Sequence, residues 1–120
     1  MKKNLPNNIA AICWHGGTEP PFSGKYNDFY EVGTYHCVSC DQLLFSSQCK
    51  YNSYSGWPSY FDADGELTLI QDHSHGMIRE EVKCAKCHVH LGHVFDDGPE
   101  PTGKRYCINS LVLNFKPECL

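Results

Sequence analysis

The chain has 120 residues, of which 41% are hydrophobic and 12% aromatic, and its formal net charge is −4. This composition is typical of one globular domain and excludes an intrinsically disordered chain. The sequence holds no run of lysine and arginine and no apolar stretch of about 18 residues, so neither a nucleic acid nor a membrane is an expected partner.

The first part of the chain is rich in asparagine, glycine and proline. We expect residues 1–29 to form an arm that packs on the same domain and contains one short helix. Its apolar segment, residues 9–14, is shorter than the core of about 7–15 residues that a signal peptide requires. A cytoplasmic location is therefore expected.

From residue 30 onward, short segments rich in β-forming residues alternate with turn signals. Asp64 and Gly65 form one such turn signal, and residues 97–103 have the composition of a loop. The pattern predicts a mainly β, antiparallel domain over residues 30–120, with short helices confined to the N-terminal arm. The expected strands are residues 33–36, 42–45, 65–70, 78–83, 90–95 and 105–115.

Two Cys-x-x-Cys motifs predict a metal site, formed by Cys37, Cys40, Cys84 and Cys87. Each motif can point both of its sulfurs at one ion, and four thiolates complete a tetrahedral zinc site. Two disulfides or redox-active dithiols are the alternative, although no βαβ pattern surrounds either motif. Because four sulfurs leave no open position for substrate, we expect one structural zinc that joins two distant hairpins.

Three histidines follow the second motif, at positions 88, 90 and 93. His88 is expected at the surface. On a regular strand His90 and His93 would lie on opposite faces, but a bulge at Gly92 would bring both to one side. From the residues alone, a structural role for each is the favoured interpretation.

Cys107 lies in the last predicted strand, between Arg105 and Asn109. Residues two apart on a strand share a face, so these three side chains would project together. A guanidinium favours the thiolate form of a cysteine, and a carboxamide can donate a hydrogen bond to an oxyanion. A reactive nucleophile and a buried, inert cysteine both remain open from this stretch alone.

The chain resembles the methionine-R-sulfoxide reductase B family from about residue 30 to residue 115. Several segments in order make this resemblance specific, and it implies two antiparallel sheets. The segments are SGWPSY at residues 55–60, the two cysteine motifs, HLGHVFDDGP at residues 90–99 and RYCINS at residues 105–110.

The resemblance implies that the chain reduces the R epimer of methionine sulfoxide in peptides and oxidised proteins. Cys107 would attack the sulfoxide sulfur, methionine would leave, and a cysteine sulfenic acid would remain. A monomer reduced by thioredoxin is the expected working form.

The resemblance also implies roles for other residues. His90, His93 and Asn109 would bind and protonate the sulfoxide oxygen. Arg105 would stabilise the thiolate, and Asp97 would orient the arginine. Trp57 would hold the methyl group of the substrate, although an ordinary core tryptophan is the alternative.

The sequence departs from the family where many members carry a second, resolving cysteine. That position is Ser55, which cannot form a disulfide. Cys13, Cys49 and Cys119 remain as candidate resolvers, and direct reduction by thioredoxin or a small thiol is a further alternative. Cys13 is favoured among the three because an arm can move to close a disulfide.

Two other hypotheses compete with this one. In the first, the chain is a non-catalytic zinc-containing β domain that binds a peptide or small ligand. In the second, the zinc is catalytic, so that its loss would abolish activity and leave the fold intact.

Overall fold

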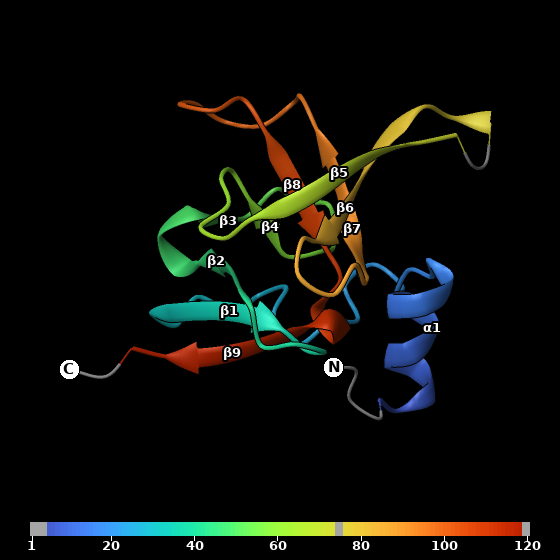
Figure 1. Ribbon diagram of the computed structural model, residues 1–120. Coiled ribbons are helices and arrows are strands. Elements are labelled where there is room, and N and C mark those ends of the chain that lie inside the picture. Colours follow the sequence, from blue (N-terminus) through green and yellow to red (C-terminus); the bar gives the residue numbers. More distant parts are fainter. Residues whose placement is uncertain (1–4, 74–75, 119–120) are drawn as a thin grey trace.

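The computed structural model describes residues 5–73 and 76–118 (Figure 1). The described chain is mainly β, with two antiparallel sheets and one N-terminal α-helix, as the sequence predicts. The smaller sheet has the strand order β2-β1-β9, and the larger has the order β3-β4-β8-β7-β6-β5. The strands are β1 (Gly33–Cys37), β2 (Leu43–Ser46), β3 (Lys50–Tyr51), β4 (Ser59–Tyr60), β5 (Leu67–Asp72), β6 (Arg79–Cys84), β7 (His90–Phe95), β8 (Arg105–Ile108) and β9 (Leu113–Pro117).

The prediction of one strand over residues 105–115 is wrong. The chain leaves the large sheet after Ile108, forms the 3-10 turn η3 (Ser110–Val112) and enters the small sheet as β9. Residues 108–110 and 112–113 are all buried, because the segment passes between the two sheets. A run buried on every side shows no alternation of apolar and polar residues, so the sequence pattern could not reveal the break.

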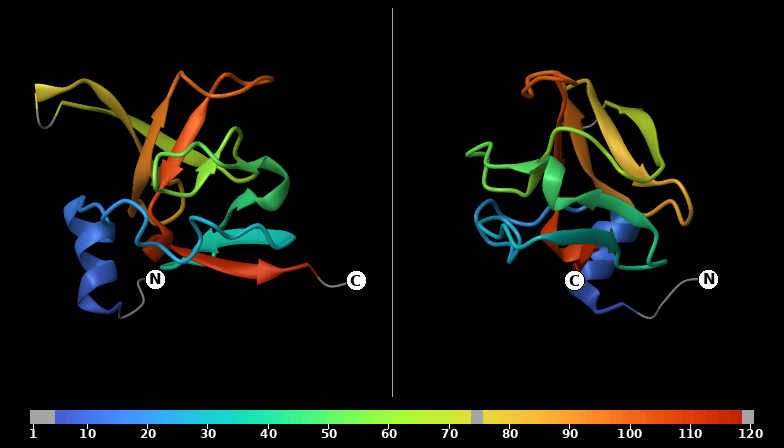
Figure 2. Two further views of the ribbon diagram at one scale, coloured as in Figure 1. Left: turned by 180° about the vertical axis from the view of Figure 1, so that it is seen from behind. Right: turned by 90° about the vertical axis from the view of Figure 1, so that its left-hand side faces the viewer.

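The N-terminal arm begins with helix α1 (Asn7–His15), which lies beside the small sheet in all views (Figures 1 and 2). Ile9, Ile12 and Cys13 are spaced as i, i+3 and i+4, so they form one apolar face that packs on the core. Through this face the helix contacts β7 and η3. No helix among the described residues is long and apolar enough to span a membrane.

Aromatic rings join the two sheets. Phe45 of β2 stacks on Tyr60 of β4, with ring centroids 4.3 Å apart and planes 13° apart. Tyr35 of β1 meets the same tyrosine edge to face at 5.3 Å. All three residues are fully buried. Such pairs add about 0.5–1.5 kcal/mol each beyond the burial of their area, so they fix the position of one sheet against the other.

The centre of the large sheet brings three polar side chains together. Cys107 of β8 is directly opposite Ser59 of β4 on one side and His93 of β7 on the other. Directly opposite residues in antiparallel strands share a face, so these side chains are neighbours. The close approach of β7 to β8 requires Gly92, because a Cβ atom there would lie 2.0 Å from the carbonyl oxygen of Cys107.

Candidate active site

The four cysteines of the two motifs form one cluster, and their sulfur atoms all lie within 4.8 Å of one another. The sulfurs of Cys37 and Cys87 are 3.6 Å apart, and those of Cys40 and Cys84 are 3.5 Å apart. A disulfide requires about 2.0 Å. Zn–S bonds of about 2.3 Å in a tetrahedron give sulfur separations of about 3.8 Å. The cluster therefore fits a bound metal ion and not disulfides.

The two motifs turn in the same way. Asp41 donates its backbone N–H to the carbonyl of Cys37 at 2.8 Å, and His88 donates to the carbonyl of Cys84 at 2.9 Å. Both donors adopt left-handed backbone angles, with φ of 68° and 66°. Cys37 ends a strand of the small sheet and Cys84 ends a strand of the large one, so a shared ion would link the two sheets. His88 is exposed, as expected.

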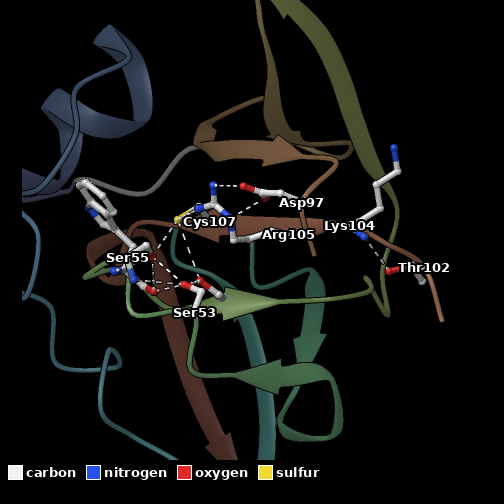
Figure 3. Close-up of polar contacts among 9 residues, drawn as sticks. Ser53, Ser55, Asp97, Thr102, Lys104, Arg105 and Cys107 are labelled. Atoms are coloured by element: carbon white, nitrogen blue, oxygen red, sulfur yellow. Dashed lines mark hydrogen bonds and ion pairs between the residues drawn. The ribbon is translucent and has the colours of Figure 1, made fainter. Parts of the chain in front are cut away.

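Figure 3 shows the guanidinium of Arg105 between the carboxylate of Asp97 and the sulfur of Cys107. Nε and Nη2 of the arginine donate to the two carboxylate oxygens at 2.8 and 3.1 Å, and Nη1 donates to Sγ at 3.5 Å. The hydrogen bonds from Arg105 lower the pKa of Asp97, and the carboxylate raises the pKa of Arg105. The aspartate thus holds a permanent positive charge against the cysteine sulfur.

This contact leads to a first prediction. Replacing Arg105 by methionine keeps a long side chain but removes the positive charge that contacts Sγ of Cys107, and such a charge makes a cysteine sulfur more reactive. We expect alkylation of Cys107 by iodoacetamide at neutral pH to become about tenfold slower. The rate is measured by mass spectrometry of the Cys107 peptide, and alkylation of Cys49 in the same sample is the control. An unchanged rate at Cys107 would show that the arginine does not act on the sulfur.

Two serine hydroxyls contact the sulfur, and a third serine joins them; Figure 3 labels Ser55 and Ser53 of this group. Oγ of Ser55 lies 3.4 Å from Sγ of Cys107, and Oγ of Ser59 lies 4.0 Å from it. Oγ of Ser53 joins these two hydroxyls, at 2.8 and 2.6 Å. The position where many relatives of the resembled family carry a resolving cysteine is thus in contact with Cys107. Sequence reasoning missed Ser53 and Ser59, and only the register of β4 against β8 places the latter opposite the cysteine.

Both histidines lie on one side of β7, at a ring distance of 5.4 Å. The register of β6 against β7 skips Leu91, next to the glycine where we expected a bulge. Nδ1 of His90 lies 2.7 Å from Oε2 of Glu81, and Nε2 of His93 lies 2.8 Å from Oδ2 of Asp72. Sequence reasoning missed both carboxylates, because only the pairing of strands in the sheet brings them close to the histidines of β7.

Burial lowers the pKa of His90, and its hydrogen bond with Glu81 opposes this only in part. The folded protein therefore favours neutral His90, while the unfolded chain binds a proton near the ordinary value of 6.5. In that pH range the unfolded state holds more protons, so stability rises with pH and is lost as the pH falls below about 6.5.

A second prediction follows from this difference in proton binding. Replacing His90 by glutamine removes the titrating group, so the free energy of unfolding should depend less steeply on pH between pH 7.5 and 5.5. Urea denaturation of both proteins at several pH values measures the two slopes. His73, which is exposed directly after β5, gives a control when it is replaced by glutamine. Equal slopes for the His90 variant and the unaltered protein would contradict the prediction.

A small pocket of about 90 Å³ opens beside Cys107. Among the described residues, its lining includes no cysteine of the metal cluster. His93 lines it, whereas His90 faces an adjoining cavity with Glu81 and Asp72. The lining residues are Thr18, Trp57, Arg79, Gly92, His93, Phe95, Cys107 and Asn109.

The N-terminal arm holds two walls of this pocket in place through the backbone of Glu19. Its N–H donates to Oδ1 of Asn109 at 3.0 Å, and its carbonyl accepts from Nε1 of Trp57 at 2.9 Å. Nδ2 of Asn109 also donates to the carbonyl of Leu91 at 2.9 Å. Asn109 follows the end of β8 at Ile108, and it lines the pocket together with Cys107. Sequence reasoning missed Glu19.

Two of the candidate resolving cysteines, Cys13 and Cys49, are described by the structure, and neither lines the pocket. Cys13 is buried in the packed face of α1, and burial raises its pKa to about 11. Cys49 ends the 3-10 segment η1 (Ser47–Cys49), and burial raises its pKa as well. Cys119 lies outside the described residues. The packing of α1 removes the reason for favouring Cys13, because the helix would have to leave the core to deliver its thiol.

Comparison with known proteins gives a consistent result. A model of the SelR domain matches residues 5–117. A peptide methionine sulfoxide reductase MsrB from Thioalkalivibrio sulfidiphilus is 57% identical over 118 residues, which cover 97% of this chain and 86% of the relative. Proteins of the same name from Pseudomonas fluorescens and Pseudomonas putida are each 56% identical over 108 residues, covering 88% of this chain and 83% and 81% of the relatives.

Proposed function

The chain belongs to the SelR domain family of peptide methionine sulfoxide reductases, and on this premise we propose that it reduces the R epimer of methionine sulfoxide in peptides and proteins. One observation carries the proposal. The thiol of Cys107 lines a small pocket with an indole and a histidine, and a fixed guanidinium contacts its sulfur. This arrangement supplies a nucleophile, a methyl site and a proton donor within one pocket.

In the proposed reaction, the thiolate of Cys107 attacks the sulfoxide sulfur. The sulfoxide oxygen takes up a proton and moves to the cysteine sulfur as the bond between oxygen and the substrate sulfur breaks. The bond formed between the two sulfurs breaks in the same transfer, which leaves a thioether and a cysteine sulfenic acid, so the substrate sulfur gains two electrons and the cysteine sulfur loses two. The charge of Arg105 favours the attacking thiolate.

The proton reaches the oxygen from the histidine side of the pocket. His93 lines the pocket with its Nε2 held by Asp72, which leaves the other ring nitrogen for the substrate oxygen or a bridging water. Burial favours the neutral form of His90, which lies beside His93 and faces the adjoining cavity. Asn109, fixed at both ends of its carboxamide, has one remaining N–H for the same oxygen.

The indole of Trp57 binds the methyl group of the substrate. Its N–H is held by Glu19, so the ring is fixed as one wall of the pocket. A methyl group next to a polarised sulfur packs well on an aromatic face. The pocket volume of about 90 Å³ suits such a small group and excludes a bulky one.

We propose zinc as the ion of the four-cysteine cluster, because four thiolates are a closed tetrahedral set for zinc. When bound, zinc supplies folding energy and no step of the reaction. Cys37 and Cys40 would hold it at the end of β1 in the small sheet, and Cys84 and Cys87 would hold it at the end of β6 in the large one.

The sulfenic acid must then be reduced by a thiol, which forms a disulfide with Cys107 and releases water. Ser55 occupies the contact position and cannot do this. Since Cys13 and Cys49 lie away from the pocket, we propose that an external dithiol protein of the thioredoxin type attacks the sulfenic acid directly.

An assay with separate epimers tests the proposed function. The protein, with dithiothreitol as reductant, should convert N-acetyl-methionine-R-sulfoxide to the thioether and leave the S epimer unchanged. Chiral chromatography measures both substrates. Equal conversion of the two epimers, or of neither, would contradict the proposal.

A further inference from the structure

Two exposed aromatic residues adopt a backbone conformation that is unfavourable for bulky side chains. Phe22 is 69% exposed and Tyr54 is 83% exposed, and their φ angles are 64° and 61°. Among the described residues, the other non-glycine positions with such angles are Asp41 and His88, which turn the two cysteine motifs. Strained positions of this kind cluster at functional sites, where the surrounding structure imposes them.

Both aromatic residues belong to the segments that build the pocket. Tyr54 directly precedes Ser55, whose hydroxyl contacts the sulfur of Cys107. Phe22 donates its backbone N–H to the carbonyl of Gly56 at 2.7 Å, and a Cβ at this glycine would lie 3.0 Å from the phenylalanine ring. The ring thus packs on the backbone next to Trp57. Both rings are thus exposed on segments whose neighbouring residues, Ser55 and Trp57, contact Cys107 or line the pocket.

The size of the pocket determines what must lie against this rim. A volume of about 90 Å³ holds the end of a methionine sulfoxide side chain, so the polypeptide that carries it must stay outside. Methionine is mostly buried in folded proteins, and segments that supply a core carry further apolar side chains close in sequence. These apolar side chains would bury apolar surface by packing on the exposed aromatic rings.

We propose that Phe22 and Tyr54 form a docking surface for apolar side chains that flank methionine sulfoxide in an extended polypeptide. The inference rests on the proposed function and adds a preference among peptide substrates. Aromatic residues provide large contact areas with little loss of side-chain entropy, which suits a surface that must accept many sequences.

Steady-state kinetics with dithiothreitol as reductant test the docking surface. The substrates are N-acetyl-methionine-R-sulfoxide, a peptide with leucine on both sides of the sulfoxide, and the same peptide with serine in place of leucine. Phe22→Asn and Tyr54→Asn are combined in one variant, because asparagine tolerates left-handed angles. Val32→Asn is the matched control, since Val32 is 58% exposed and lines a different cavity.

We expect the double variant to lose about tenfold in kcat/KM for the leucine peptide and to match the unaltered protein on the other two substrates. The control variant should match the unaltered protein on all three. An equal loss on all substrates would mean that the residues shape the pocket itself and would overturn the docking surface. So would an effect that appears only when thioredoxin replaces dithiothreitol, because the surface would then bind the reductant.

The same experiment separates the two proposals. If the unaltered protein reduces all three substrates and the double variant does the same at equal rates, the docking surface is wrong and the proposed function stands. If the unaltered protein reduces none of them, both fall together.

Discussion

Replacing Cys107 by serine is expected to abolish methionine sulfoxide reduction, with kcat lower by at least about a thousandfold. A serine hydroxyl at neutral pH is a poor nucleophile and cannot be oxidised to a sulfenic acid. The change should leave the fold intact, because serine is similar in size and Ser55 and Arg105 can still hydrogen-bond to it. The assay uses the R epimer with dithiothreitol, which bypasses any need for a resolving cysteine.

The control for this experiment is Cys49→Ser, which removes another partly buried thiol away from the pocket. It should keep nearly full activity with dithiothreitol, and circular dichroism should show the same fold for both variants. Activity retained in the Cys107 variant would reject the catalytic assignment and favour a binding domain.

Removing the metal is expected to unfold the protein. Four-sulfur zinc sites contribute about 10–16 kcal/mol of apparent binding energy, whereas domains of this size are stable by about 5–15 kcal/mol. The cluster links the end of β1 with the end of β6, so its loss removes one of the links between the two sheets. We expect a strong chelator, or Cys84→Ser, to eliminate the cooperative thermal transition seen by circular dichroism.

Adding zinc back separates a structural metal from a catalytic one. The chelated protein should regain its transition and its activity together when zinc is restored, while the Cys84 variant should regain neither. A chelated protein that keeps its fold but loses activity would instead place the metal in the reaction.

The sequence predicted the parts of the molecule that depend on local spacing. Two Cys-x-x-Cys motifs indicate a metal cluster at any separation, because each motif forms its own turn. The expected strands that correspond to β1, β2, β5, β6 and β7 lie within about two residues of the observed ones, since glycine, proline and aspartate mark their turns, whereas the short strands β3 and β4 were not predicted. Cys107 was predicted as the nucleophile because several motifs occur in a specific order, and not because its own strand is unusual.

Long-range register could not be predicted in the same way. Glu81 and Asp72 meet the two histidines only because β5, β6 and β7 are neighbours in one sheet, with a skipped residue at Leu91. Glu19 reaches Asn109 across most of the chain through its backbone, which carries no sequence signal. Such contacts are specified by the packing of the whole domain.

The central claim is that Cys107 accepts the oxygen of the substrate. It is tested most directly by a single turnover, in which the reduced, zinc-loaded protein meets one equivalent of a methionine-R-sulfoxide peptide. Dimedone then traps any sulfenic acid, an alkylating agent labels free thiols, and mass spectrometry assigns each cysteine. We predict one equivalent of methionine peptide and a dimedone adduct on Cys107, with Cys13, Cys49 and Cys119 still reduced. An unmodified Cys107 beside an intact sulfoxide would contradict the account.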